Sequence, residues 1–184
     1  SRDLNCIVAM DDEGSGAFFA DVVINAILHD IPYNVNRYIG YDYLFLKNIK
    51  KIIKKKVPEK ANHIVASFGG HDHRDLMGFF LNSLNNINCM LNHHPGIDLL
   101  VGYEKKEVIK QWEDQIEKVS IKYDIDLRLI VRPPNFLEIL IKADLAVLAG
   151  GLTIFDAVSL GIPSIGLPQY KHQLNTLENL DANG

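Results

Sequence analysis

The stretch Ala143–Gln173, ADLAVLAGGLTIFDAVSLGIPSIGLPQYKHQ, decides the fold of this chain. Leu145–Leu148 is a short apolar run of the kind that forms a buried strand, and Ile165–Leu167 begins a second one. Gly150 and Gly151 allow the backbone to turn between the first strand and the helical segment that follows, because they carry no Cβ. A strand, a helix and a second strand in this order predict a right-handed βαβ unit of a parallel sheet.

The helix of this unit has sequence signals at both ends. Thr153 is a good N-cap, and Asp156, three residues later, completes a capping-box pattern. Gly161 and Pro163 mark the end of the helix. The free N–H groups and the positive dipole at a helix N-terminus attract anions. We therefore expect a phosphate group at this turn, at the carboxyl end of the first strand.

From residue 60 onward, strand and helix patterns alternate. Apolar runs predict further strands at Ile64–Ser67, Ile97–Gly102 and Asp126–Val131. The alternation predicts an α/β fold, a Rossmann-like doubly wound parallel sheet of five strands with helices on both faces. The intervening helices are expected at Asp72–Asn85, Lys105–Tyr123 and Phe136–Ile141, the last with Asn135 and Glu138 as a capping box. The side chains expected to face inward are Leu76, Phe79, Phe80 and Leu84, then Val108, Trp112, Ile116 and Val119.

A second glycine turn, Ser67-Phe68-Gly69-Gly70-His71-Asp72, follows the strand Ile64–Ser67. Ligands of open α/β sheets bind in the crevice at the carboxyl ends of the strands. Two such turns in one sheet therefore favour a shared phosphorylated ligand, although both also fit tight turns with no ligand. Asp156 is either the helix cap or an acceptor for a ribose hydroxyl. Gln173 and Asn175, after the last strand, either bind sugar hydroxyls or begin the next helix.

The first quarter of the chain is interpreted as the end of a second domain. Residues 1–46 predict only short strands, at Leu4–Met10, Ala20–Asn25 and the tyrosine-rich Tyr38–Leu46, and so short a segment buries little surface by itself. We assign residues 47–184 to the main domain. Its first segment, KNIKKIIKKKVPEK at Lys47–Lys60, predicts an amphipathic helix. This helix is either a solvated connection or a weak contact with an anionic membrane surface.

The composition argues against several classes of protein. The chain has 184 residues and a net charge of −4, so no basic field favours nucleic acid. Cys6 and Cys89 form no disulfide framework, and no His or Cys spacing favours a metal. No apolar run approaches the ~18 residues of a membrane span, and the start SRDLN lacks a signal peptide. We therefore expect a cytoplasmic protein without a cofactor, and the missing initial Met indicates an excised or processed piece.

Two segments resemble a known group of enzymes. SFGGHD at 67–72 and ADLAVLAGGLTIFDAVSLGIPSIGLPQYKHQLN at 143–175 resemble the C-terminal domain of GT-B-fold sugar-nucleotide enzymes. The nearest likeness is to the UDP-sugar hydrolases of pseudaminic acid biosynthesis and the spore coat polysaccharide glycosyltransferases. IVAMDDEG at 7–14, ADVVIN at 20–25 and YIGYDYLFLK at 38–47 are similar to the end of the N-terminal domain in that family.

The resemblance implies that this chain binds the UDP-sugar donor of a glycosyltransferase or hydrolase in cell-surface glycan synthesis. Asp156 would accept from the ribose, where related enzymes have Glu. The other residues that it implies in donor binding are Phe68, Gly69 and Gly70, then Gly150, Gly151, Leu152 and Thr153 for the diphosphate, and His172, Gln173 and Asn175 near the sugar.

The sequence also departs from the family. His172 stands where the hydrolase has Asn, and Leu152 replaces a commoner Ser. The Gly-x-Gly-His segment that carries the general base of the family is absent from these 184 residues. We therefore expect this chain to bind the donor without turnover. The alternatives are an enzyme similar to UDP-N-acetylglucosamine 2-epimerase and a non-catalytic α/β binding module.

Overall fold

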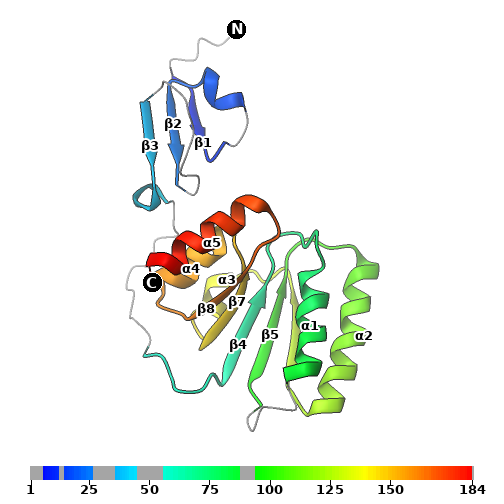
Figure 1. Cartoon of the computed structure of the whole chain (residues 1–184). Helices are drawn as coiled ribbons and strands as arrows, with labels where there is room; N and C mark the ends of the chain where they lie inside the picture. The colour runs from blue at the N-terminus through cyan, green and yellow to red at the C-terminus, as the bar shows by residue number, and fades with distance from the viewer. Residues whose placement is uncertain (1–5, 13–14, 27–35, 45–55, 88–93, 184) are drawn as a thin grey trace. The chain divides into compact units, whose positions relative to one another are not determined.

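The computed structural model describes residues 6–12, 15–26, 36–44, 56–87 and 94–183 (Figure 1). The chain divides into two compact units, Ser1–Asn48 and Ile49–Gly184, which are described separately. The predicted helix at Lys47–Lys60 lies mostly outside the described residues, and residues 56–60 are not helical. The sequence also allows the helix that ends near Asn85 to continue at Cys89–His94 after a break, and this segment lies almost wholly outside the described residues. In the part of the chain that the structure describes, no helix is long and apolar enough to cross a membrane.

The smaller unit, Ser1–Asn48, contains a three-stranded parallel sheet in its described part. Its strands are β1 (Val8–Met10), β2 (Val22–Asn25) and β3 (Asn36–Ile39), in the order β1-β2-β3. The short 3-10 helices η1 (Ser15–Phe19) and η2 (Tyr41–Tyr43) follow β1 and β3. A small core forms from the buried side chains Ala17, Ala20 and Val23.

The larger unit, Ile49–Gly184, is built on a five-stranded parallel sheet in its described part. The spatial order is β6-β5-β4-β7-β8, so the strands stand as third, second, first, fourth and fifth along the chain. This is the order of the first five strands of the Rossmann fold, and it confirms the predicted doubly wound sheet. The strands are β4 (His63–Ser67), β5 (Gly96–Val101), β6 (Leu127–Val131), β7 (Leu145–Ala149) and β8 (Ser164–Leu167).

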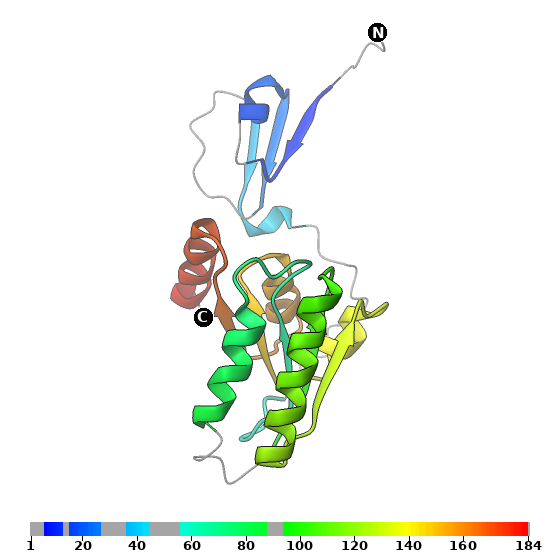
Figure 2. The ribbon, with the colours of Figure 1, turned by 90° about the vertical axis from the view of Figure 1, so that its right-hand side faces the viewer.

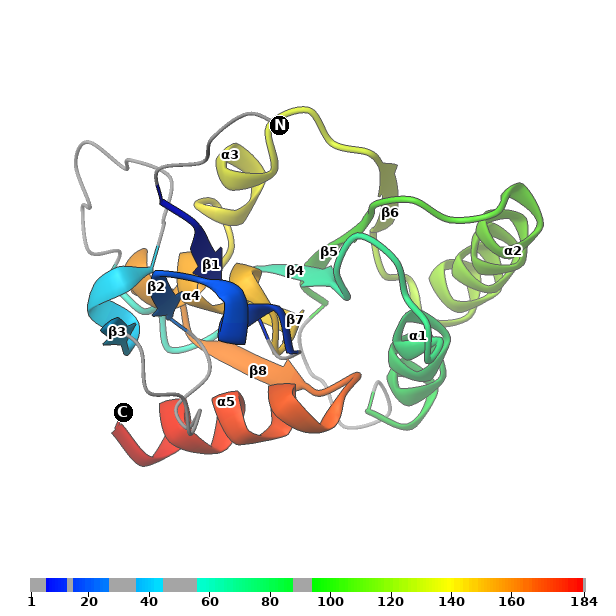
Figure 3. The same ribbon diagram turned by 90° about the horizontal axis from the view of Figure 1, so that it is seen from above.

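Helices cover both faces of this sheet. Figures 1 and 3 show α1 (Leu76–Ile87) and α2 (Lys106–Tyr123) together on one face. The same views place α3 (Phe136–Leu140) and α4 (Leu152–Ser159) on the other face. The last helix, α5 (Lys171–Asn183), follows β8. Because helices cover both faces, the inner strands β4, β5 and β7 are mostly buried, whereas the edge strands β6 and β8 are more exposed.

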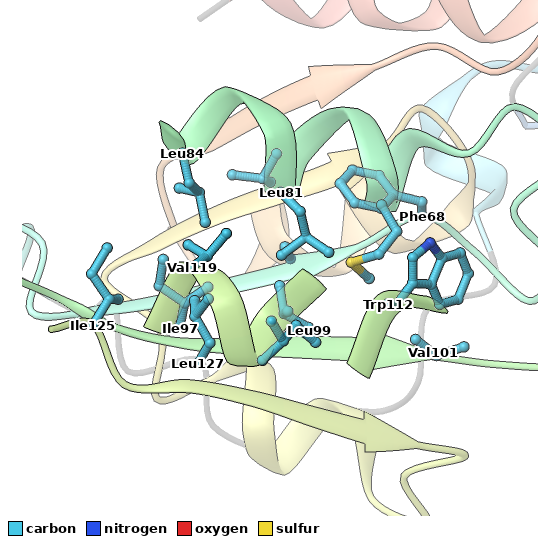
Figure 4. Close-up of a cluster of buried hydrophobic side chains, with 14 residues drawn as sticks. Phe68, Leu81, Leu84, Ile97, Leu99, Val101, Trp112, Val119, Ile125 and Leu127 are labelled. Atoms are coloured by element: carbon cyan, nitrogen blue, oxygen red, sulfur yellow. The ribbon is translucent and has the colours of Figure 1, made fainter. Parts of the chain in front are cut away.

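The main core lies between the sheet and the paired helices α1 and α2, which run side by side (Figure 2). Trp112 and Val119 are buried there as expected (Figure 4). Ile116 is buried in the same cluster. Phe79 is a wrong prediction, because its side chain is 59% exposed, and Met77 and Leu81 face the core instead. Of the other predicted positions on α1, Leu84 is buried, and Leu76 and Phe80 are partly buried against the core.

With Asp72 as its cap, the helix α1 was expected to begin at residue 73, and it begins three residues later, at Leu76. Asp72 still caps it from a distance, because its carboxylate accepts from the N–H groups of Leu76 at 2.9 Å and Met77 at 2.8 Å. Asp75 Oδ1 accepts from Gly78 N–H at 3.1 Å and from Trp112 Nε1–H at 2.9 Å, which ties α1 to α2. The loop after β4 is therefore longer than the sequence pattern indicated.

Both predicted capping boxes are wrong. Gly151 is the N-cap of α4 and Thr153 lies inside the helix, where no described side chain makes a cap hydrogen bond. At the start of α3, Asn135 Nδ2 donates to the Glu138 carboxylate at 3.2 Å, so the two side chains bind each other rather than the backbone. The predicted helix end is confirmed, since Gly161 has φ 68° just after α4.

Candidate functional site

The candidate site lies where the strand order of the larger sheet reverses, between β4 and β7. The chain leaves β4 toward β5 on one side and leaves β7 toward β8 on the other. The loops that follow the two strands diverge, and ligands of open α/β sheets bind in the crevice between such loops. Figure 3 shows the sheet from above, with β4 and β7 as neighbours at its centre. The two glycine pairs of the sequence follow these two strands.

The turn after β4 is held in place by the hydrophobic core and by the loop after β5. The Phe68 side chain is buried in the core, so only its backbone is available at the site. Gly69 has φ 90°, a conformation that strongly favours glycine. Gly70 O accepts from Tyr103 N–H at 2.5 Å, and a Cβ on Gly102 would lie 2.5 Å from that same oxygen. Gly102, which the sequence reasoning missed, thus allows the loops after β4 and β5 to touch.

The turn after β7 uses its two glycines differently. Gly150 is buried, and a Cβ there would lie 3.0 Å from Gln173 and Leu177 of α5, so this glycine serves close packing. Gly151 has ordinary φ, −90°, and more space around it. Leu152 and Thr153 are the first residues of α4, and their N–H groups precede the first intrahelical bonds. This end of the turn therefore offers backbone donors and a positive dipole to an anion.

Two buried glutamines connect the glycine turns. Gln169 Nε2 donates to Phe68 O, and its Oε1 accepts from His73 N–H at 3.2 Å. Gln169 N–H in turn donates to Gln173 Oε1 at 2.8 Å. A Cβ built on Gly69 would lie 3.8 Å from Gln169 Nε2, and one built on Gly151 would lie 3.8 Å from Gln173 Nε2. The structure therefore brings the two predicted turns together through α5 and the loop before it.

A hollow of about 350 Å³ lies beside the turns. Gly69, Gly70 and Thr153 line it together with residues after β5 and β6. On that side the Arg132 guanidinium carbon lies 4.8 Å from the centroid of the Tyr103 ring, a cation–π distance. The lining of the hollow thus includes both glycines of the first turn, Thr153 of α4, and the paired side chains of Tyr103 and Arg132.

A larger hollow, of about 640 Å³, lies along the edge strand β8 between α4 and α5. Its lining includes Val158, Ile162 and Leu177, and no residue of the two glycine turns. Size alone therefore does not identify the site, because the backbone donors and the strand-order reversal are elsewhere.

The remaining predicted residues lie on α4 and α5. Asp156 is half-buried in the second turn of α4, one turn below the glycine pair. His172, Gln173 and Asn175 all lie in the first turns of α5, so they begin a helix. The Asn175 side chain is exposed. Gln173 is only 8% exposed, and its side-chain oxygen accepts the hydrogen bond from Gln169 N–H.

Four rings form a row across the loops after β4 and β8. His71 packs edge-on against His73 with centroids 4.2 Å apart, and His73 lies 6.0 Å from Tyr170. Tyr170 stacks on His172 at 5.5 Å. Among the described residues, no group of three or more His, Cys, Asp or Glu side chains could hold a metal ion. The row therefore adds aromatic and imidazole groups, rather than metal ligands, beside the glycine turns.

Comparison with known proteins gives two relatives of low identity. No protein-family model matches the chain. The Spore coat polysaccharide biosynthesis protein SpsG of Bacillus subtilis is 23% identical over 190 residues, which cover 99% of this chain and 54% of that protein. SpsG is a distant homologue of this chain. The uncharacterized protein MJ1062 of Methanocaldococcus jannaschii is 25% identical over 171 residues, covering 84% of this chain and 34% of that protein. The chain thus spans about half the length of one relative and a third of the other.

Proposed function

We propose that this chain is the nucleotide-sugar-binding part of a glycosyltransferase or UDP-sugar hydrolase of cell-surface polysaccharide biosynthesis. The observation that carries the proposal is the placement of two glycine turns on either side of the strand-order reversal, joined by Gln169 and Gln173. The homology to SpsG supports the polysaccharide pathway. The resemblance of residues 67–72 and 143–175 to UDP-sugar enzymes supports uridine as the nucleoside.

The diphosphate would lie between the turns. The N–H groups of Gly69 and Gly70 would donate from one side, and those of Gly151, Leu152 and Thr153 from the other. The dipole of α4 adds a partial positive charge at the same point. These donors are fixed by the fold before a ligand arrives, so little reorganisation opposes binding.

The nucleoside would occupy the hollow of about 350 Å³ beside the turns. The Tyr103 ring and the Arg132 guanidinium offer a flat surface for a base. Asp156 would accept from a ribose hydroxyl, and Gln173 and Asn175 would lie toward the sugar. In this arrangement the backbone N–H groups stabilise the charge that develops on UDP when the bond to the anomeric carbon breaks. A water or a sugar hydroxyl, activated by residues outside this chain, would attack that carbon.

Calorimetric titration of the purified chain with UDP, CDP, GDP and ADP tests this function. We expect UDP to bind selectively and Gly151→Val to weaken it by about tenfold or more, because the added side chain displaces the anion from its donors. Gly96→Val, at the amino edge of β5 where a Cβ meets only Asp126 Oδ2 at 3.9 Å, is the matched control and should bind normally.

Titration with pyrophosphate separates the two interpretations of Asp156. Asp156→Ala should weaken UDP but leave pyrophosphate unchanged if the carboxylate binds ribose. No binding of any nucleotide by the folded chain would favour a non-catalytic module instead. Product analysis on a longer protein that contains this chain would then distinguish a transferase or hydrolase from an epimerase.

A further inference from the structure

The buried carboxylate of Glu104 contacts the exposed imidazole of His71, which directly follows the first glycine turn. The Glu104 side chain is 5% exposed, and its Oε1 lies 2.6 Å from His71 Nδ1. The same oxygen accepts from Asp72 N–H at 2.7 Å. Neither residue belongs to the donor set proposed above, and the helices, strands and turns already described do not require a charged pair at this position.

The surroundings of His71 define which ring nitrogen carries hydrogen. Besides Glu104 Oε1, the carbonyl oxygen of Tyr103 lies 2.9 Å from Nδ1. A carbonyl oxygen only accepts, so Nδ1 carries the hydrogen and donates. Nε2 is then the nitrogen that is presented to a ligand, and the His71 side chain is 46% exposed.

The neighbouring charged and titratable side chains of Asp72 and His73 make contacts within the fold. The Asp72 carboxylate accepts from two N–H groups at the start of α1. His73 packs edge-on against the His71 ring and contacts Tyr170 on its other side. Glu104 therefore places a negative charge in direct contact with the His71 ring, and together with the Tyr103 carbonyl it fixes the orientation of that ring.

We propose that His71 binds a phosphate oxygen of the nucleotide as an imidazolium, with Glu104 as its positioning residue. The proposal rests on the proposed function, because it places the diphosphate at the turn Gly69-Gly70 that immediately precedes His71. The imidazolium Nε2–H donates to a phosphate oxygen. A His71 ring that is neutral before binding takes this proton from solvent, so binding is linked to pH and no covalent bond changes.

Calorimetry in two buffers of different ionisation enthalpy measures this proton uptake directly. We titrate UDP into the 184-residue chain between pH 6 and pH 8.5, the range in which imidazoles commonly titrate. We expect proton uptake on binding and an affinity that decreases as pH rises. His71→Gln should abolish the uptake and weaken UDP by about tenfold, the value of one charge-assisted hydrogen bond.

Glu104→Gln and His94→Gln complete the experiment. Glu104→Gln removes the charge behind the ring, so both the affinity for UDP and the proton uptake should decrease while some binding remains. His94 is exposed and precedes β5 at the opposite edge of the sheet, so His94→Gln should change neither affinity nor uptake. Circular dichroism checks that each variant folds. If Glu104→Gln does not fold, His71→Gln still tests the proposal, because the His71 side chain is exposed.

The outcomes separate the two proposals. If UDP binds to the parent chain and His71→Gln binds it equally well with equal proton uptake, the role of His71 is wrong and the proposed function stands. If the folded parent chain binds no nucleotide, both proposals are wrong. If proton uptake disappears in His94→Gln rather than in His71→Gln, the assignment to the His71 and Glu104 pair is also overturned.

Discussion

The adjacent residues Gly150 and Gly151 are glycines for different reasons. The sequence predicted that both glycines bind phosphate as a pair, because a turn between a strand and a helix explains the presence of two adjacent glycines. In the structure, a Cβ on Gly150 would meet α5 at 3.0 Å, whereas a Cβ on Gly151 would lie at an ordinary contact distance, 3.8 Å, from Gln173 Nε2. Only the tertiary contact with Gln173 and Leu177, more than twenty residues away in the chain, distinguishes them.

Stability measurements on single alanine variants test this difference. Gly150→Ala should lower the free energy of unfolding by about 1–3 kcal/mol, because its Cβ would lie 3.0 Å from three atoms of α5. Gly151→Ala should change it by less than about 1 kcal/mol, since its φ suits any residue and the nearest atom is 3.8 Å away. Urea denaturation gives both values, and equal losses would contradict the packing role of Gly150.

At the scale of elements, the strands and most helix faces were predictable because burial on both sides leaves a strong apolar pattern. The residues at which the helices begin were not predictable in the same way. The capping signal at Thr153 and Asp156 is local, but the glycine turn allows α4 to begin at Leu152 without any described side-chain cap. The link through Gln169 was also missed, because it joins residues 101 positions apart and carries no sequence signal.

The Gln169 link predicts a specific loss of stability. Gln169→Leu would leave the Phe68 carbonyl and the His73 N–H without their partner, and each unpaired buried group costs about 1–3 kcal/mol. Thermal unfolding should therefore shift to clearly lower temperature. Gln111→Leu, the same change at an exposed position of α2, should leave the unfolding temperature nearly unchanged. Equal effects of the two variants would show that the link does not stabilise the site.

At the scale of the whole molecule, every residue of the candidate site belongs to the unit Ile49–Gly184. The sequence predicted the main domain to begin at residue 47, near this boundary. The smaller unit has its own three-stranded sheet and core, which the short apolar runs only partly indicated.

This organisation predicts that residues 56–184 fold without the smaller unit. The shortened chain should unfold cooperatively and bind UDP within about threefold of the full chain, because it retains both glycine turns and the whole five-stranded sheet. Chemical denaturation and calorimetry measure the two properties. A shortened chain that folds but loses UDP binding would place part of the nucleotide site in residues 1–55.

The central claim is that the two glycine turns jointly bind the diphosphate of a nucleotide. The most direct measurement is a titration of the ¹⁵N-labelled chain with UDP, followed through its backbone amide resonances. We predict saturable shifts that are largest at the two turns, with Gly96 at the opposite edge of the sheet unchanged. Shifts confined to the larger hollow beside β8, or no shifts at all, would contradict the account. The amides expected to move most are those of Gly69, Gly70, Gly151, Leu152 and Thr153.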